Sequence, residues 1–300
     1  MRPTPAASPG ALLSARTRVV DVITLTKARV NALVVATTAG GYYMASTGSI
    51  DPGAVVVTCL GTALVASGAA AYNQVTERET DRLMNRTRLR PVADGRMTPA
   101  EGRTVATALS ATGLLMLWLG VNLPAAIVAL ATLVIYAAVY TPLKRRTSVS
   151  TIIGAVPGAL PPLIGWAGAG ASLADPAAWA LFFLMFLWQL PHFLAIAWIY
   201  RDDYARAGLP MLPVIDPHGA VTGRQVMLWA ATIVPFSELP FLLGLTTATY
   251  AVGALVLGIG QAAIALMFAI RRTDQNARRL FYASITYLPL LWLLMGFARR

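Results

Sequence analysis

The sequence predicts an all-α integral membrane protein in which nine transmembrane helices surround a central cavity. Three observations predict this class: an apolar composition, a series of long apolar stretches, and polar residues gathered in the connections between them. Of the 300 residues, 57% are hydrophobic and only 12% are charged, and the mean hydropathy is +0.63. Soluble domains of this size are less apolar. We therefore expect lipid to be the solvent around most of the chain.

Long apolar stretches recur along the chain, and each is long enough to cross the roughly 30 Å hydrocarbon core of a bilayer as a helix. The fifth stretch contains Pro157, Pro161 and Pro162, which remove backbone hydrogen bonds and break a helix. Such a broken helix either lines a cavity or packs closely on its neighbours through Gly and Ala. The nine expected spans are residues 29–47, 54–72, 104–121, 123–141, 152–170, 177–200, 226–245, 248–270 and 279–297.

The basic residues predict how the chain lies in the membrane. The N-terminal segment and the connections after the second, fourth, sixth and eighth spans hold 22 of the 24 Lys and Arg residues. By the positive-inside rule, these segments face the cytoplasm, and we expect a multi-pass protein of the cell (inner) membrane. Residues 1–22 are rich in Pro, Ala and Ser and lack the pattern of a signal peptide. We expect them to form a disordered cytoplasmic tail, and residues 23–300 to form a single transmembrane domain.

The net charge and the cysteine content limit which ligands and which covalent or metal sites the chain is expected to have. The net charge is +11, but the basic residues lie in short loops rather than along one soluble face, which favours anionic lipid and diphosphate-like ligands over nucleic acid. The single cysteine, Cys59, lies inside an apolar stretch. The sequence therefore predicts no disulfide framework and no cysteine metal site.

The first of three polar blocks follows the second span and reads NQVTERETDRLMNRTRLRP, from Asn73 to Pro91. Asn73, Glu77 and Asp81 recur every four residues, so a helix places them on one face. Two carboxylates and an amide supply the oxygen ligands that Mg²⁺ prefers, and we expect these three residues to bind it and to be catalytic. The alternative is a solvated helix held by weak pairs four residues apart.

The second block ends the fourth span and includes Lys144 and Arg145, and the third, YRDDYARAGLPML, follows the sixth span with Asp202 and Asp203. All three blocks are expected on the cytoplasmic side. Carboxylates for Mg²⁺ beside cations for phosphate suit the ionisation of an allylic prenyl diphosphate, with an apolar bundle sheltering the carbocation. Basic residues at a helix end are also ordinary topology signals. The candidates for diphosphate contacts are Arg78, Arg88, Lys144, Arg145 and Arg206.

Several segments in order resemble the UbiA superfamily of intramembrane prenyltransferases, and most closely its protohaem IX farnesyltransferase branch. They are TKARV, NQVTERETDRLMNRTRLRP, YTPLKRRT, GAVPGALPPLIGWA, WQLPHF and YRDDYARAGLPMLPV. The resemblance implies a UbiA-like fold of nine helices. It also implies transfer of farnesyl from farnesyl diphosphate to a vinyl group of haem B, with water addition, giving haem O and diphosphate. Haem A synthase or oxidase assembly factors are the implied partners.

The motifs of the superfamily map onto this chain unevenly. Asn73, Glu77 and Asp81 match the first aspartate-rich motif, with Glu77 where many relatives have Asp. Asp202 and Asp203 match the second, DxxxD, only in part, because Arg206 stands four residues after Asp202. We expect Asp202 and Asp203 to be catalytic and Asp203 to contribute to the metal site, either with its own Mg²⁺ or with one shared through the substrate.

The sixth span holds the candidates for binding haem. His192 in WQLPHF is a transmembrane histidine that either ligates or orients haem iron or is hydrogen-bonded within the bundle. Trp188 and Tyr200 either line the porphyrin site or pack and anchor the helix. Two other functions stay open from the residues alone: prenylation of an aromatic ring such as a quinone precursor, and secondary transport, since broken helices also mark transport sites.

Overall fold

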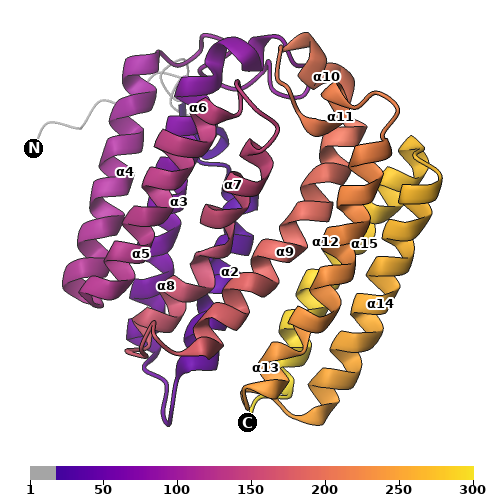
Figure 1. Ribbon diagram of the computed structural model, residues 1–300. Helices are drawn as coiled ribbons and strands as arrows, with labels where there is room; N and C mark the ends of the chain where they lie inside the picture. The colour runs from indigo at the N-terminus through magenta and orange to yellow at the C-terminus, as the bar shows by residue number, and fades with distance from the viewer. Residues whose placement is uncertain (1–17) are drawn as a thin grey trace, which may run out of the picture.

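The computed structural model describes residues 18–300, which form a bundle of long helices with short helices near its ends (Figure 1). This arrangement confirms the all-α class. In chain order the elements are α2 (Ala28–Ala45), α3 (Pro52–Arg82), α4 (Pro99–Gly120), α5 (Leu123–Val134), the π-helix η1 (Ile135–Tyr140), α6 (Thr141–Leu143), α7 (Ser150–Ala159), α8 (Pro161–Gly168), α9 (Pro176–Ile199), α10 (Arg201–Arg206), α11 (Leu212–Ile215), α12 (Ala220–Ser237), α13 (Leu239–Leu242), α14 (Ala248–Ile270) and α15 (Asp274–Phe297).

Helices occupy all nine ranges in which spans were expected, but only seven helical segments within residues 18–300 are long and apolar enough to cross a membrane. The two that fall short are α2, which carries Arg29 and Asn31, and α4, which carries Arg103 near its start. The chain is a multi-pass membrane protein, and the count of nine spans stays a prediction. Of the expected tail, residues 1–22, the first 17 lie outside the described residues. Residues 18–22 are not disordered but belong to a helical stretch that continues to residue 25.

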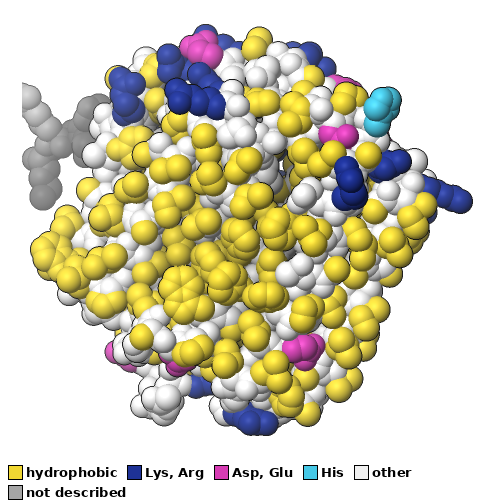
Figure 2. Space-filling view, in the orientation of Figure 1, with side chains coloured by type: hydrophobic (Ala, Val, Ile, Leu, Met, Phe, Trp, Pro, Cys, Tyr) yellow, Lys and Arg dark blue, Asp and Glu magenta, His cyan; other side chains and the backbone are white. Residues whose placement is uncertain are grey.

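Polar and apolar surfaces separate along the bundle. Figure 2 shows a broad hydrophobic band across the middle of the molecule and most of the Lys and Arg side chains toward its upper end. In Figure 1 the same end holds α6, α10 and α11, while α13 and the C-terminus lie at the opposite end. The three polar blocks of the sequence therefore reach the same end of the bundle.

Helix α3 extends ten residues beyond the expected span, to Arg82. It begins at Pro52, where the Asp51 carboxylate accepts a hydrogen bond from the backbone N–H of Gly53 at 2.8 Å. Because α3 continues without a break into the first polar block as far as Arg82, Asn73, Glu77 and Asp81 share one helical face, as the spacing predicted, and all three are buried.

The proline-rich fifth span is broken, and both expectations for it hold. Helix α7 ends at Ala159 and α8 begins at Pro161. A side chain at Gly165 would overlap the carbonyl oxygen of Thr38 in α2, so the absence of a Cβ lets these two helices approach closely. Pro157 and Pro161 line a cavity in the bundle. The two halves of the broken helix therefore line a cavity through Pro157 and Pro161 and pack tightly against α2 at Gly165.

Candidate active site

Two of the polar blocks meet through a buried ion pair. The Nζ of Lys144, just after α6, lies 3.1 Å from Oε1 and 3.3 Å from Oε2 of Glu77 in α3. Burial is the largest single influence on the pKa of Lys144 and lowers it. The charge of Glu77, the neighbouring Tyr140 and Tyr204, and the hydrogen bond to Glu77 together raise the pKa by more, so it lies above its ordinary value. Lys144 is therefore a fixed cation beside the first acidic motif.

Arg90 pairs with the other carboxylate of this motif. After α3 the chain reverses over residues 83–91, and the Thr87 hydroxyl donates to the carbonyl oxygen of Asp81 at 3.1 Å. The reversal brings one guanidinium nitrogen of Arg90 to 2.8 and 2.7 Å from the two Asp81 carboxylate oxygens, and to 3.9 Å from Glu77. Asp81 is fully buried, and an unpaired carboxylate is very unfavourable away from water. The positive charge of Arg90 compensates the negative charge of Asp81.

Asn73 joins a third cation to the cluster. Its Oδ1 accepts a hydrogen bond from the Nζ of Lys27 at 2.9 Å, and its Nδ2 donates to the Thr141 hydroxyl at 3.3 Å. Burial, and then the charge of Arg90, lowers the pKa of Lys27 to about 7. The two carboxylates thus lie among three basic side chains, Lys27, Arg90 and Lys144, an arrangement that favours a further anion.

The second acidic motif is built differently. Asp203 in α10 is buried, accepts a hydrogen bond from the backbone N–H of Arg86 at 3.3 Å and pairs with Arg206. Asp202 is exposed and belongs to none of the ion pairs within residues 18–300. Both aspartates are present at the expected end, but only Asp203 faces the chain that carries the first motif.

Arg86 connects the two motifs. Its guanidinium donates to the Tyr204 hydroxyl at 3.2 Å and lies 5.1 Å from the centre of the Tyr200 ring. The Nζ of Lys144 lies 5.9 Å from the centre of the Tyr204 ring. Tyr200 therefore packs against Arg86. The sequence made Tyr200 a candidate for binding haem, but it is not among the residues that line the central cavity.

Three other candidates for diphosphate contacts have weaker positions. Arg78 pairs with its neighbour Glu79 at 3.1 Å. Arg145 is exposed and donates to the carbonyl oxygen of Thr76 at 3.1 Å, and Arg88 is exposed as well. Of the expected basic candidates, Lys144 alone contacts a carboxylate of the first motif directly.

The predicted metal ligands do not form a closed cage. In the part of the chain that the structure describes, no three His, Cys, Asp or Glu side chains lie close enough to hold a metal ion. Glu77 and Asp81, one turn apart with Asn73 beside them, nevertheless offer buried hard oxygens of the kind that Mg²⁺ uses together with water and substrate phosphate. Each is at present bound by Lys144, Arg90 or Lys27.

A cavity of about 320 Å³ extends from this cluster into the bundle. Lys27 lies at its charged end, and its walls are mostly apolar and aromatic side chains, among them Tyr136 and Tyr140 of η1. The same cavity reaches Trp188 and His192 in α9. One continuous space therefore touches both Lys27 of the charged cluster and the expected haem-binding histidine.

The His192 ring is held on three sides. It stacks between Trp188 and Phe281, with ring centres 5.0 and 5.2 Å away, and its Nδ1 lies 2.8 Å from the Ser284 hydroxyl. That hydroxyl also lies 2.7 Å from the carbonyl oxygen of Phe281. A carbonyl only accepts, so both contacts are satisfied when Ser284 donates to Phe281 and Nδ1–H donates to Ser284. The lone pair then belongs to Nε2.

Several residues of this site were not foreseen as site residues. Arg90 and Lys27 join the cluster only because the chain folds back over many residues, although both lie inside segments that carry the family resemblance. Tyr136 and Tyr140 turn into the cavity through the π-helix, a feature typical of functional sites. Gln189, two residues before the proline of WQLPHF, lines the cavity as well. A buried polar residue in a transmembrane span is the signal that could have identified it.

Comparison with known proteins agrees with this geometry. Residues 33–293 match the UbiA prenyltransferase family. The chain belongs to this family. It is 44% identical over 284 residues to a protein named protoheme IX farnesyltransferase from Solibacter usitatus, with 92% of this chain and 97% of the relative covered. A protein of the same name from Koribacter versatilis is 41% identical over 288 residues, which cover 92% of each chain.

Solved structures show the same fold at low sequence identity. A digeranylgeranylglyceryl phosphate synthase superposes with a TM-score of 0.78 at 15% identity, covering 94% of this chain and 98% of that one. A UbiA homolog from Archaeoglobus fulgidus bound to GPP and Mg²⁺ superposes with a TM-score of 0.66 at 17% identity, covering 92% and 99%. These likenesses confirm a UbiA-like fold.

Proposed function

We propose that this chain transfers the farnesyl group of farnesyl diphosphate to a vinyl group of haem B. The observation that carries the proposal is one largely apolar cavity that has Lys27 of the buried charged cluster at one end and His192 along its wall. The names of relatives at 44% and 41% identity support the choice of prenyl donor and acceptor.

The reaction balances without an oxidant. The bond between the farnesyl C1 and the diphosphate oxygen breaks, and diphosphate leaves with the electron pair. The vinyl π electrons form the new bond to C1, and the resulting cation beside the porphyrin ring takes up water and loses a proton. The products are haem O, with its hydroxyethylfarnesyl group, and diphosphate.

The charged cluster is the proposed diphosphate site. Lys144, Arg90 and Lys27 offer guanidinium and ammonium donors to phosphate oxygens. Asn73, Glu77 and Asp81, with Asp203 nearby, are the residues that would hold Mg²⁺. When bound, Mg²⁺ would neutralise charge that develops on the leaving diphosphate. Lys144, Arg90 and Lys27 already bind the side-chain oxygens of Glu77, Asp81 and Asn73. When Mg²⁺ and diphosphate bind, these oxygens would exchange the basic side chains for Mg²⁺, and the basic side chains would turn to the phosphate oxygens.

The cavity walls protect the farnesyl cation. The lining is predominantly apolar, which excludes water until the new bond has formed. The Tyr136 and Tyr140 rings, with centres 5.3 Å apart, present π faces of the kind that attract cations. We assign to these two side chains the stabilisation of positive charge at C1.

His192 is the proposed ligand or orienting group for haem iron. Its Nε2 carries the lone pair because Nδ1–H donates to Ser284, and its ring is fixed by Trp188 and Phe281. A fixed neutral imidazole with a free nitrogen is the form that binds iron. Trp188 would contact the porphyrin face.

The cellular setting follows from the reaction. The enzyme would lie in the cell (inner) membrane with the charged cluster at the cytoplasmic surface, where water-soluble diphosphate is released. Haem A synthase or an oxidase assembly factor would take up the product.

Mass spectrometry of haem tests the proposal. Haem extracted from cells lacking their own activity should contain haem O only when this chain is expressed. The matched control is the same cells expressing Asp81→Asn. If haem B stays unmodified while a ring acceptor such as 4-hydroxybenzoate is prenylated, the acceptor is an aromatic ring and the proposal is wrong.

A further inference from the structure

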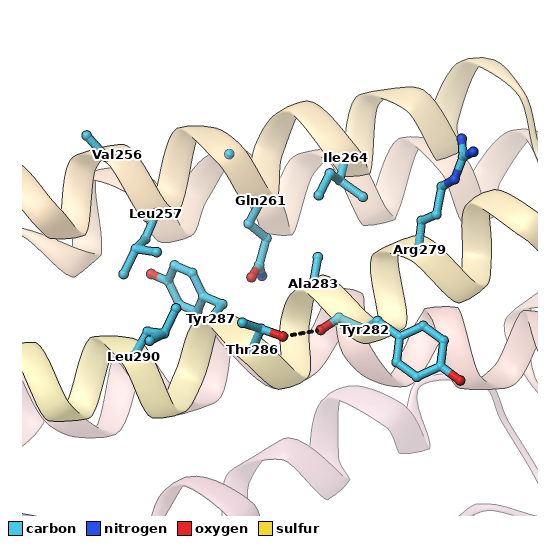
Figure 3. Close-up of a pocket in the computed structure, with 11 residues that line it drawn as sticks. Val256, Leu257, Gln261, Ile264, Arg279, Tyr282, Ala283, Thr286, Tyr287 and Leu290 are labelled. Atoms are coloured by element: carbon cyan, nitrogen blue, oxygen red, sulfur yellow. Dashed lines mark hydrogen bonds between the residues drawn. The ribbon is translucent and has the colours of Figure 1, made fainter.

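A second hollow lies away from the central cavity, on the outer side of α14 and α15 (Figure 3). This groove of about 550 Å³ has apolar side chains along both walls, among them Val256, Leu257 and Leu290. It shares no lining residue with the central cavity. Both helices are long and apolar enough to span a membrane, and large apolar side chains beside the groove are exposed, so it opens toward lipid.

Gln261 points into this groove without a partner. Its side chain is only 3% exposed, yet neither the amide nitrogen nor the amide oxygen has a hydrogen bond. Figure 3 shows the amide directed between the two helices, toward Ala283 and Thr286. A buried amide with both groups unpaired is rare in folded proteins and costly in lipid. A ligand with a polar group at this depth would satisfy it.

Basic side chains without acidic partners lie at one end of the groove. Arg279 is part of its lining and also borders an adjoining hollow that contains Arg271. None of the ion pairs within residues 18–300 includes Arg271, Arg272, Arg278 or Arg279, and the acid of this segment, Asp274, pairs with Arg201 instead. This end of the groove therefore suits an anionic group.

The length of the groove matches one leaflet. Along α15 it runs from Arg279 to Leu290, a rise of about 16 Å at 1.5 Å per residue. That is about half of a hydrocarbon core of roughly 30 Å. Ala283 and Thr286, the α15 residues that face Gln261, lie one to two helical turns from Arg279 toward the middle of the membrane. If Arg279 binds a lipid head group, the Gln261 amide lies just below that head group.

We propose that the α14–α15 groove binds an anionic phospholipid of the leaflet on the side of the charged cluster. The phosphate lies against Arg279 and Arg271, one acyl chain follows the apolar walls, and the Gln261 amide N–H donates to an ester carbonyl. The amide oxygen accepts from a water that accompanies the head group. The lipid thus completes the surface of α14 and α15 without entering the central cavity.

Native mass spectrometry of the full chain in detergent tests this lipid site. Phosphatidylglycerol should bind more tightly than phosphatidylcholine, and millimolar inorganic phosphate should not displace it. Arg279→Gln should weaken phosphatidylglycerol binding by about 10-fold, the effect of losing one charge-assisted hydrogen bond. The control is Arg103→Gln, an exposed arginine of α4 outside the groove, which should leave binding unchanged. Equal losses in both variants would mean non-specific attraction and would overturn the site.

A measurement on the unaltered protein guards against a folding defect in the variants. Phosphatidylglycerol with a photoreactive acyl chain should crosslink to the peptide that contains residues 279–290. Crosslinking confined to other helices would contradict the proposal. So would displacement of the lipid by haem, or a lipid-free dimer in which a second copy of the chain covers the groove.

Discussion

The two acidic motifs lie at the same end of the molecule but are built in different ways. Glu77 and Asp81 are buried on a 31-residue helix and are held by cations from two other segments of the chain. Asp202 and Asp203 lie on the six-residue α10, and only Asp203 is buried. The first motif is therefore held through both of its carboxylates by other segments of the chain, whereas the second motif is held by another segment only through Asp203.

The largest effect is expected at the first motif. Asp81→Asn should lower kcat/KM for farnesyl transfer by about 100-fold or more, because it removes a charge that would hold Mg²⁺ against the leaving diphosphate. Initial rates at limiting Mg²⁺ measure the effect. Wild-type rates in this variant would mean that the first motif is not the cation site.

Removing the partner of Glu77 tests whether the first motif is held in place before substrate binds. Lys144→Met should reduce the free energy of unfolding by about 3 kcal/mol, because the buried Glu77 carboxylate loses its nearest cation and keeps only the longer pair with Arg90. Denaturant titration in detergent measures this change. Arg145→Met is the matched control, since Arg145 is exposed and contacts only a backbone carbonyl, and it should change the free energy of unfolding by less than about 0.5 kcal/mol.

The second motif should respond unequally to the same substitution. Asp203→Asn should lower kcat/KM by about 10-fold, because it weakens the hydrogen bond from the Arg86 backbone and the pair with Arg206. The exposed Asp202→Asn should stay within about 2-fold of wild type. Steady-state kinetics of the two variants, measured under the same conditions, test this difference. A larger loss of kcat/KM in Asp202→Asn than in Asp203→Asn would assign the catalytic role to the exposed carboxylate.

The smallest effect is expected away from both motifs, at Ser284. Ser284→Ala should raise the Kd for haem B by about 5-fold, because His192 loses the hydrogen bond that directs its lone pair to the cavity. The KM for farnesyl diphosphate should not change. Haem titration followed by the Soret band measures both affinity and ligation, and an unshifted band with unchanged Kd would remove His192 from the haem site.

The sequence predicted the fold better than the details of the site, for a physical reason. Apolar length alone determines where a membrane helix forms, so every expected range is helical. The face shared by Asn73, Glu77 and Asp81 also follows from helical spacing. The pairs Lys144–Glu77 and Lys27–Asn73 instead depend on packing between segments 67 and 46 residues apart, which no local pattern specifies. The π-helix Ile135–Tyr140, which carries the two tyrosines that line the cavity, was likewise not predicted from the local sequence.

Product analysis with purified protein tests the central claim most directly. Wild-type protein should be incubated with haem B, farnesyl diphosphate and Mg²⁺, and both products measured in the same sample. We predict haem O and diphosphate in equal amounts, with the initial rates of both lowered together by about 100-fold or more for Asp81→Asn. Diphosphate release without haem O, or prenylation of 4-hydroxybenzoate in place of haem B, would contradict the account.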